Sequence, residues 1–252
     1  MVGGGQTRDR LGCLLALVLA VAPALVGCAD RTVAARPGSE PTHDVIGNRT
    51  GTNTGTADRA RDLLDAVRRV EQRPDVPGYD RSCSPGAGCV FGTDWSDDTD
   101  APLGHNGCDT RNDVLGRSLE AVVFSERSNG CDVVAGLLLD PYTGETLDYA
   151  IDGSRIHIDH LFPLAAAWDL GAAEWSPERR ARFANDPDLE LLAVSGSANL
   201  AKGDSTPASW LPPDLSFRCA YVTSYLEVAL AYGLAVTDAD VRVMEPAIRK
   251  SC

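Results

Sequence analysis

Two stretches decide the fold and the candidate chemistry: RIHIDH at residues 155–160 and ELLAVSGSANLAKGD at residues 190–204. The first predicts a short apolar strand that ends in an Asp-His pair. The second predicts an apolar run that leads through small residues into a short helix, where Asn199 and Lys202 share one face. A carboxylate, an amide oxygen and an imidazole brought together can hold one hard divalent cation and activate one water molecule.

This pattern resembles the HNH, or His-Me finger, endonucleases, whose core is a β-hairpin followed by a helix that grips one metal ion. By resemblance, Asp159 and His160 match the strand-end pair that opens the motif. Asn199 matches the final ligand on the helix, and Lys202 matches the lysine that follows it three residues later. Glu190 stands where the family has its middle Asn, which is a departure from the pattern.

Five motifs outside these stretches look like the secreted bacterial branch of the group, which is related to the nuclease domain of the GmrSD restriction enzymes. They are GCDTRN (107–112), LDPYTG (139–144), FANDP (183–187), WLPP (210–213) and RCAY (218–221). The resemblance covers about residues 79–252. It implies an α+β fold, with a ββα-metal core, added helices, a small antiparallel sheet and disulfides.

The function implied by the resemblance is metal-dependent hydrolysis of phosphodiester bonds in nucleic acid, with DNA as the expected substrate. His160 would be the general base, because the ordinary pKa of histidine, about 6.5, suits neutral pH. Asp159 and Asn199 would hold one divalent cation, expected to be Mg²⁺, with Mn²⁺, Ca²⁺ or Zn²⁺ as alternatives. Lys202 would contact a phosphate of the substrate.

Three further residues have open roles. Arg111 could also grip a phosphate, or form a structural ion pair with Asp109 or Asp113. His157 is expected at the surface or behind the metal ligands. Glu190 could approach His160 and raise the pKa of its imidazole, point to the metal, or face away from the site.

The alternative function is a non-catalytic surface lipoprotein that keeps the ββα shape as a binding module. The formal net charge of −13 favours it, because proteins that bind nucleic acid are usually basic. The intact set of candidate catalytic residues argues against it. A nuclease of this charge would need a small, locally basic site, formed by Arg155, Arg179, Arg180, Lys202 and Arg218.

The chain is expected to have three parts. Residues 1–27 read as a lipoprotein signal peptide, because two arginines precede an apolar run that ends in LVGC at residues 25–28. Lipidation of Cys28 would anchor the exported chain at the membrane surface or, with Cys28 unmodified, the protein would be released outside the cell. Residues 28–56 read as a flexible tether, and residues 57–252 as the HNH-type nuclease domain. No protein partner is implied.

Six cysteines remain beyond Cys13 and Cys28, and an exported compartment favours disulfides. Proximity in the sequence and the family resemblance favour the pairs Cys83–Cys89, Cys108–Cys131 and Cys219–Cys252. The acidic stretch at residues 94–100 is interpreted as a solvated loop. A calcium site there is the alternative, but the stretch lacks the order of ligands found in an EF-hand.

Hydrophobic periodicity and turn residues predict the remaining elements. Strands are expected at residues 133–139, 146–151 and 155–158, and helices at residues 57–70, 162–170 and 217–233. Two more helices are expected to begin at Ser176 and at Thr237, and Gly171 is expected to end the helix before it.

Overall fold

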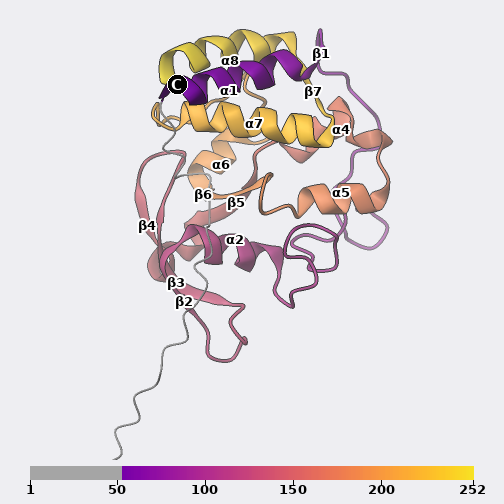
Figure 1. Cartoon of the computed structure of the whole chain (residues 1–252). Helices are drawn as coiled ribbons and strands as arrows, with labels where there is room; N and C mark the ends of the chain where they lie inside the picture. The colour runs from indigo at the N-terminus through magenta and orange to yellow at the C-terminus, as the bar shows by residue number, and fades with distance from the viewer. Residues whose placement is uncertain (1–52) are drawn as a thin grey trace, which may run out of the picture. The chain divides into compact units, whose positions relative to one another are not determined.

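The computed structural model describes residues 53–252, which form an α+β fold with small sheets (Figure 1). The expected signal peptide, the lipidated Cys28 and nearly all of the tether lie outside the described residues. The helices are α1 (Asn53–Ala66), α2 (Thr110–Ser118), α3 (Tyr149–Asp152), α4 (Leu164–Leu170), α5 (Pro177–Ala184), α6 (Gly196–Lys202), α7 (Arg218–Tyr232) and α8 (Asp238–Ser251), with short 3-10 turns at Gly153–Arg155 and Ala172–Glu174. The strands are β1 (Arg68–Val70), β2 (Glu120–Phe124), β3 (Val133–Leu139), β4 (Thr146–Asp148), β5 (Ile156–His160), β6 (Leu191–Ser195) and β7 (Ala235–Thr237).

The hairpin of β5 and β6 lies between two hydrophobic cores. The strands pair antiparallel, from Ile156 opposite Ser195 to His160 opposite Leu191. Because side chains alternate along a strand, Ile158 enters the core beneath α2 and β3, whereas Leu192 of the partner strand enters the other. Figure 1 shows α1, α7 and α8 grouped on one side of the hairpin, and α2 with β2 and β3 on the other.

Aromatic side chains dominate the larger core. Phe162 and Tyr225 stack with their ring centroids 4.5 Å apart, and both are fully buried. Tyr142 meets Tyr221 edge-on at 5.8 Å. Such pairs contribute about 0.5–1.5 kcal/mol each beyond the burial of their area. This packing fixes the loops that flank β5.

Most of the predicted helix boundaries are confirmed. Ser176 caps α5, because its side chain accepts a hydrogen bond from the backbone N–H of Arg179. Thr237 and Asp240 form a reciprocal capping box at the start of α8. Gly171 ends α4 with a φ of 149°, in the region that favours glycine.

Two predicted elements are wrong in part. Residues 68–70 do not continue the first helix; they form β1, which pairs in parallel with β7 near the other end of the chain. Residues 149–151 do not extend the strand β4, because the Asp148 side chain accepts from the N–H of Ala150 and starts α3. A distant partner decides the first case and a local cap decides the second.

Three disulfides join Cys83 to Cys89, Cys108 to Cys131 and Cys219 to Cys252, which are the pairs favoured above. The third ties the start of α7 to the residue that follows α8. None of the helices in residues 53–252 has the length and apolar character needed to cross a bilayer.

The Cys219–Cys252 disulfide should stabilise the protein more than the Cys83–Cys89 disulfide. The cysteines of the first are 33 positions apart and those of the second 6, and a longer closed loop constrains the unfolded chain more. Replacing the first pair with alanine should lower the free energy of unfolding by about 3–4 kcal/mol, and replacing the second by about 1 kcal/mol less. Urea denaturation measures both, and a larger loss for the short loop would contradict this account.

Candidate active site

A buried ion pair joins the end of α6 to the end of β5. The Lys202 ammonium lies 3.0 Å from Asp159 Oδ1 and 2.9 Å from Oδ2, and it also donates to the carbonyl oxygen of His160 at 2.7 Å. The Tyr142 hydroxyl donates to Asp159 Oδ2 at 2.5 Å. Lys202 is 1% exposed and Asp159 5% exposed, so both charges depend on each other for compensation.

The pKa values in this cluster follow from burial. Desolvation raises the pKa of Asp159, while Lys202 and the Tyr142 hydroxyl act in the opposite direction. Burial, and then the Asp159 charge, raise the pKa of Tyr142 well above its ordinary value. Tyr142 therefore keeps its proton and remains a donor to the carboxylate.

His160 occupies the opposite face of β5. Its ring stacks on Trp95, with centroids 5.8 Å apart and planes inclined by 13°. Its Nε2 lies 3.0 Å from the carbonyl oxygen of Ala184. A carbonyl only accepts, so Nε2 carries the hydrogen and Nδ1 is left with a free lone pair.

The environment keeps the imidazole neutral. Desolvation lowers the pKa of His160, the hydrogen bond that Nε2 donates to the Ala184 carbonyl opposes this, and the charges of Arg81 and Lys202 lower the pKa as well; together they give a value of about 3. A neutral ring with one free nitrogen can accept a proton, but this pKa makes it a weaker base than an ordinary histidine. His160 is only partly buried and lines a small cleft of about 10 Å³ together with Arg81, Trp95 and Asn185.

Glu190 does not contact His160, so of the three placements considered for it, the one that raises the histidine pKa does not occur. Its Oε2 accepts from the backbone N–H of Phe162 at 3.2 Å, and its Oε1 is buried without a partner. Burial raises the pKa of Glu190 well above its ordinary value. The ring is held instead by the backbone carbonyl of Ala184, the last residue of α5.

Lys202 and Arg111, the two residues considered as phosphate contacts, both have partners within the protein. The Lys202 ammonium is buried against Asp159 and is not presented to solvent. Arg111 donates to the carbonyl of Ile156 at 3.4 Å, four residues before His160 on the same strand. No ion pair within the described residues joins Arg111 to Asp109 or Asp113.

His157 lies on β5, and Asn199 lies on the short helix α6. His157 shares the β5 face of Asp159, and its ring contacts Gly196, where an added Cβ would lie 2.7 Å from Nε2. Asn199 is half-buried on α6, and its backbone carbonyl accepts a hydrogen bond from the N–H of Gly203. In residues 53–252, no three His, Cys, Asp or Glu side chains gather as a metal site.

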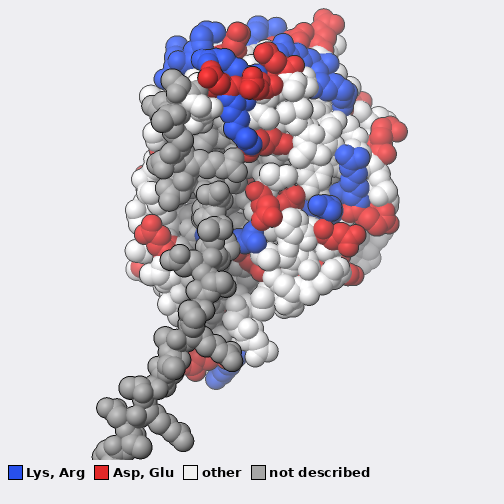
Figure 2. Space-filling model, viewed as in Figure 1, with Lys and Arg blue, Asp and Glu red and all other residues white. Residues whose placement is uncertain are grey.

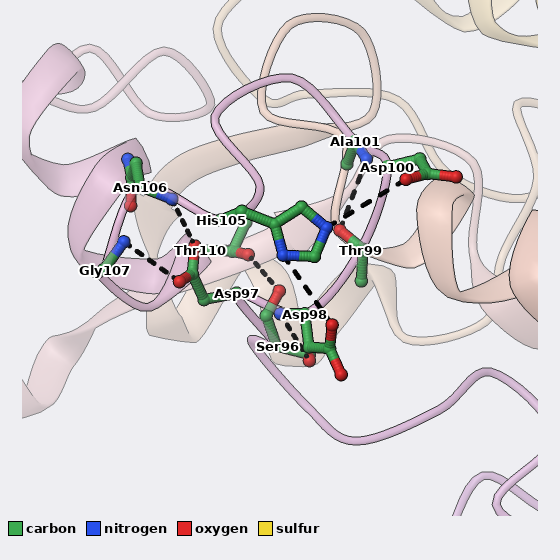
Figure 3. Close-up of polar contacts among 10 residues, drawn as sticks. All are labelled: Ser96, Asp97, Asp98, Thr99, Asp100, Ala101, His105, Asn106, Gly107 and Thr110. Carbon is green, nitrogen blue, oxygen red and sulfur yellow. Dashed lines mark hydrogen bonds and ion pairs between the residues drawn. The ribbon is translucent and has the colours of Figure 1, made fainter.

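The acidic loop is held together by its own contacts (Figure 3). The Asp97 carboxylate accepts from the backbone N–H groups of Asn106 and Gly107, each at 3.0 Å. His105 lies 3.7 Å from Asp98, whose side chain is 96% exposed. These contacts favour the interpretation as a solvated loop over a calcium site.

The expected basic site is dispersed. In the view of Figure 2, acidic and basic side chains are interspersed wherever described residues are visible. Arg179 donates to Tyr232, and Arg218 to Pro212, in both cases to a backbone carbonyl. Each of the expected basic residues thus has its own partner. The remaining contacts join Arg155 to Asp152, Arg180 to the carbonyls of Val90 and Trp175, and Lys202 to Asp159.

Larger hollows lie away from His160. One of about 800 Å³ is lined by Arg73, Asp204 and residues at the start of α8. Another of about 490 Å³ is lined by Leu215, Arg218 and residues of α8. Neither is lined by Asp159, His160, Asn199 or Lys202, and the second contains only Arg218 of the expected basic residues.

The site also contains residues that the sequence did not single out. Tyr142 and Ala184 lie inside motifs noted above, but only the folded chain shows that they hold Asp159 and His160. Trp95 and Arg81 come from the stretch before residue 109, and no spacing connects them with His160.

These features define an α+β domain in which a stacked histidine and a buried, cation-paired carboxylate lie side by side at one strand end. The chain belongs to the family described as GmrSD restriction endonucleases, C-terminal domain, an HNH-like nuclease family whose profile matches residues 109–244. Nucleases of the HNH type generally use a divalent cation. A protein of Arthroderma benhamiae, named "Uncharacterized secreted protein", is 34% identical over 210 residues, which cover 83% of this chain and 89% of that protein. No solved structure matches the chain.

Replacing Lys202 with Met should destabilise the fold by about 3–5 kcal/mol, because Asp159 would be left buried without its counterion. Adding Asp159→Asn should recover part of that loss, with a coupling free energy of about 1–3 kcal/mol. The exposed pair of Arg249 and Glu245 is the control, and its removal should cost less than about 1 kcal/mol. Urea denaturation of the set measures this, and additive losses would refute the pairing.

The ring of His160 should stay neutral in the metal-free protein as the pH falls below about 6.5, and gain its proton near the pKa of about 3. Since the unfolded chain takes up that proton at higher pH, stability should fall as the pH drops through this range. Histidine ring signals in NMR, followed from pH 8 to the acid limit of the fold, measure the titration. Glu190→Gln should leave the signal of His160 unchanged; a titration at or above pH 6.5 would contradict this placement.

Proposed function

We propose that this protein is an endonuclease that hydrolyses phosphodiester bonds of nucleic acid, with DNA as the expected substrate and His160 as the general base. One observation carries the proposal: His160 is a partly exposed residue whose ring is held by the hydrogen bond from Nε2 to the Ala184 carbonyl and by stacking on Trp95. Membership of the GmrSD C-terminal domain family supplies the reaction class.

In the proposed reaction, Nδ1 of His160 takes a proton from a water molecule as the water oxygen attacks phosphorus. The bond from phosphorus to the leaving oxygen breaks, and that oxygen takes a proton from solvent. Stacking on Trp95 and the hydrogen bond to Ala184 prevent the ring from turning, so Nδ1 keeps one direction. Fixed orientation of a base lowers the entropic cost of the step.

Asp159 and Asn199 are the residues that would hold a divalent cation, expected to be Mg²⁺. Their donors are hard oxygens of the kind that such a cation prefers. The Lys202 ammonium lies within 3.0 Å of both Asp159 oxygens and the Tyr142 hydroxyl donates to one of them, so a cation would have to displace the ammonium from this carboxylate. A bound cation would supply positive charge for the phosphate oxygens. Mn²⁺, Ca²⁺ and Zn²⁺ are alternatives with the same donors.

Lys202 has a positioning role in this proposal. Its ammonium contacts Asp159 and the carbonyl of His160 together, so it sets the distance between α6 and the end of β5. Tyr142 holds the same carboxylate from the other side. Lys202 and Tyr142 therefore hold Asp159 and the backbone of His160 as one rigid unit.

Export from the cell is part of the proposal. Disulfides persist in oxidising compartments, and the described residues contain three. The relative from Arthroderma benhamiae carries the word secreted in its name. Recovery of the chain only from the cytoplasm, with its cysteines reduced, would refute export.

His160→Ala should lower the rate of cleavage by about 10²-fold or more, because a positioned base contributes about 10²–10⁴-fold. The assay incubates the purified protein with plasmid DNA and with RNA, with and without EDTA. His105→Ala is the matched control, since His105 lies in the acidic loop with a side chain that is 58% exposed. Thermal denaturation checks that both variants fold.

Equal rates for His160→Ala and the wild type would remove the base assignment. Cleavage in the presence of EDTA would refute the requirement for a divalent cation. Binding of nucleic acid by the wild type without any cleavage would favour the alternative of a non-catalytic binding module.

A further inference from the structure

The cleft beside His160 contains one cationic side chain. Among the described residues that line it, Arg81 is the only lysine or arginine, and its side chain is 53% exposed. The nearest carboxylate oxygen, from Asp94, is 3.8 Å away, which is loose for an ion pair. Arg81, Asp94 and His160 all line this cleft. The guanidinium therefore borders the same cleft as the proposed base, and its one ionic partner among the described residues is the loosely held, exposed Asp94.

The backbone around Arg81 is firmly held. The Asp80 carboxylate accepts from the N–H groups of Ser82 and Gly88, at 3.1 Å and 2.7 Å. The Cys83–Cys89 disulfide closes the same loop. The loop ends at Phe91, which is buried in the larger core. The backbone of Arg81 is therefore held in place, and only its side chain has to move to reach a ligand.

The same segment supplies the other wall of the cleft. Trp95 follows Arg81 by fourteen residues and stacks on the ring of His160. The cation and the aromatic platform thus reach the base from one stretch, residues 80–95. That stretch precedes residues 109–244, the part of the chain that matches the family.

The other candidate cations do not line this cleft. Lys202 is buried against Asp159. Arg111 donates to the carbonyl of Ile156, and its Nη1 is buried without a partner. Arg180 donates to the carbonyls of Val90 and Trp175. Of these side chains and Arg81, only Arg81 is placed to contact a phosphate beside His160.

We propose that Arg81 contacts a phosphate of the nucleic acid bound beside His160, so that the segment of residues 80–95, which contains the Cys83–Cys89 disulfide, completes the substrate site. This inference rests on the proposed function. A guanidinium presents a planar fork of donors that matches two phosphate oxygens. Each phosphate neutralised by a protein cation releases a counterion, so the contact has a signature in the salt dependence of binding.

The experiment measures binding without cleavage. His160→Ala protein and the same protein with Arg81→Gln are titrated with a fluorescent oligonucleotide, single- and double-stranded, at several salt concentrations. Loss of one phosphate contact should weaken binding and reduce the slope of log K against log salt by about 0.7–0.9. Arg81→Lys should keep most of the slope, since the charge remains.

Arg249→Gln is the matched control. Its side chain is 58% exposed and lies 3.7 Å from Glu245, so it resembles Arg81 in exposure and in its loose partner but lies on α8. It should leave both affinity and slope unchanged. Equal melting temperatures and intact disulfides in all variants exclude a folding defect.

The outcomes separate this inference from the proposed function. If the wild type cleaves but Arg81→Gln binds with the affinity and slope of Arg249→Gln, the Arg81 contact is refuted and the nuclease stands. Weaker binding with an unchanged slope also refutes it, because the residue would then act through the shape of the loop. If the wild type neither binds nor cleaves nucleic acid, the proposed function falls and the Arg81 contact with it.

Discussion

The buried ion pair of Lys202 and Asp159 is the constraint on which the rest of the site depends. It joins the last residue of α6 to the strand that carries His160, and the same ammonium holds the carbonyl of His160. Two charges in a dry interior are tolerated only with close partners, so the helix has little freedom to move from the strand. The hairpin and the helix are thereby fixed to each other at the point where the chemistry is proposed.

The hairpin separates two tasks by the alternation of side chains along one strand. Asp159 points into the aromatic core with Tyr142, where burial and a paired charge fix its position. His160 points the other way, toward Trp95, where it is partly exposed. Neighbouring residues thus have different environments, and one of them can be held rigid while the other meets substrate.

The acidic balance of the chain fits a site with few phosphate contacts. Several arginines that would form a basic surface instead donate to backbone carbonyls, as Arg179 and Arg218 do. They close loops around the core and are not available to a long substrate. Recognition would then rest on a short stretch of backbone at the cleft, with salt-sensitive affinity.

The sequence by itself indicated most helix boundaries, and its spaced motifs indicated the family; the hairpin with its helix and the favoured disulfide pairs followed from that resemblance and, for the cysteines, from proximity in the chain. It could do so because apolar periodicity, caps and a set of spaced motifs are local properties. It gave no sign that residues 68–70 would leave the first helix to pair with residues 235–237, since that partner is distant. It also left three directions open for Glu190 and assigned Lys202 to the phosphate.

Only the tertiary structure decided these assignments. The direction of a side chain depends on which face of a strand is buried, and this turned Glu190 toward Phe162 and left Ala184 to hold His160. Burial decided the partner of Lys202, because an ammonium without solvent must find a carboxylate. The loop with Arg81 reaches the cleft through packing far from the motif, and no spacing in the sequence encodes that distance.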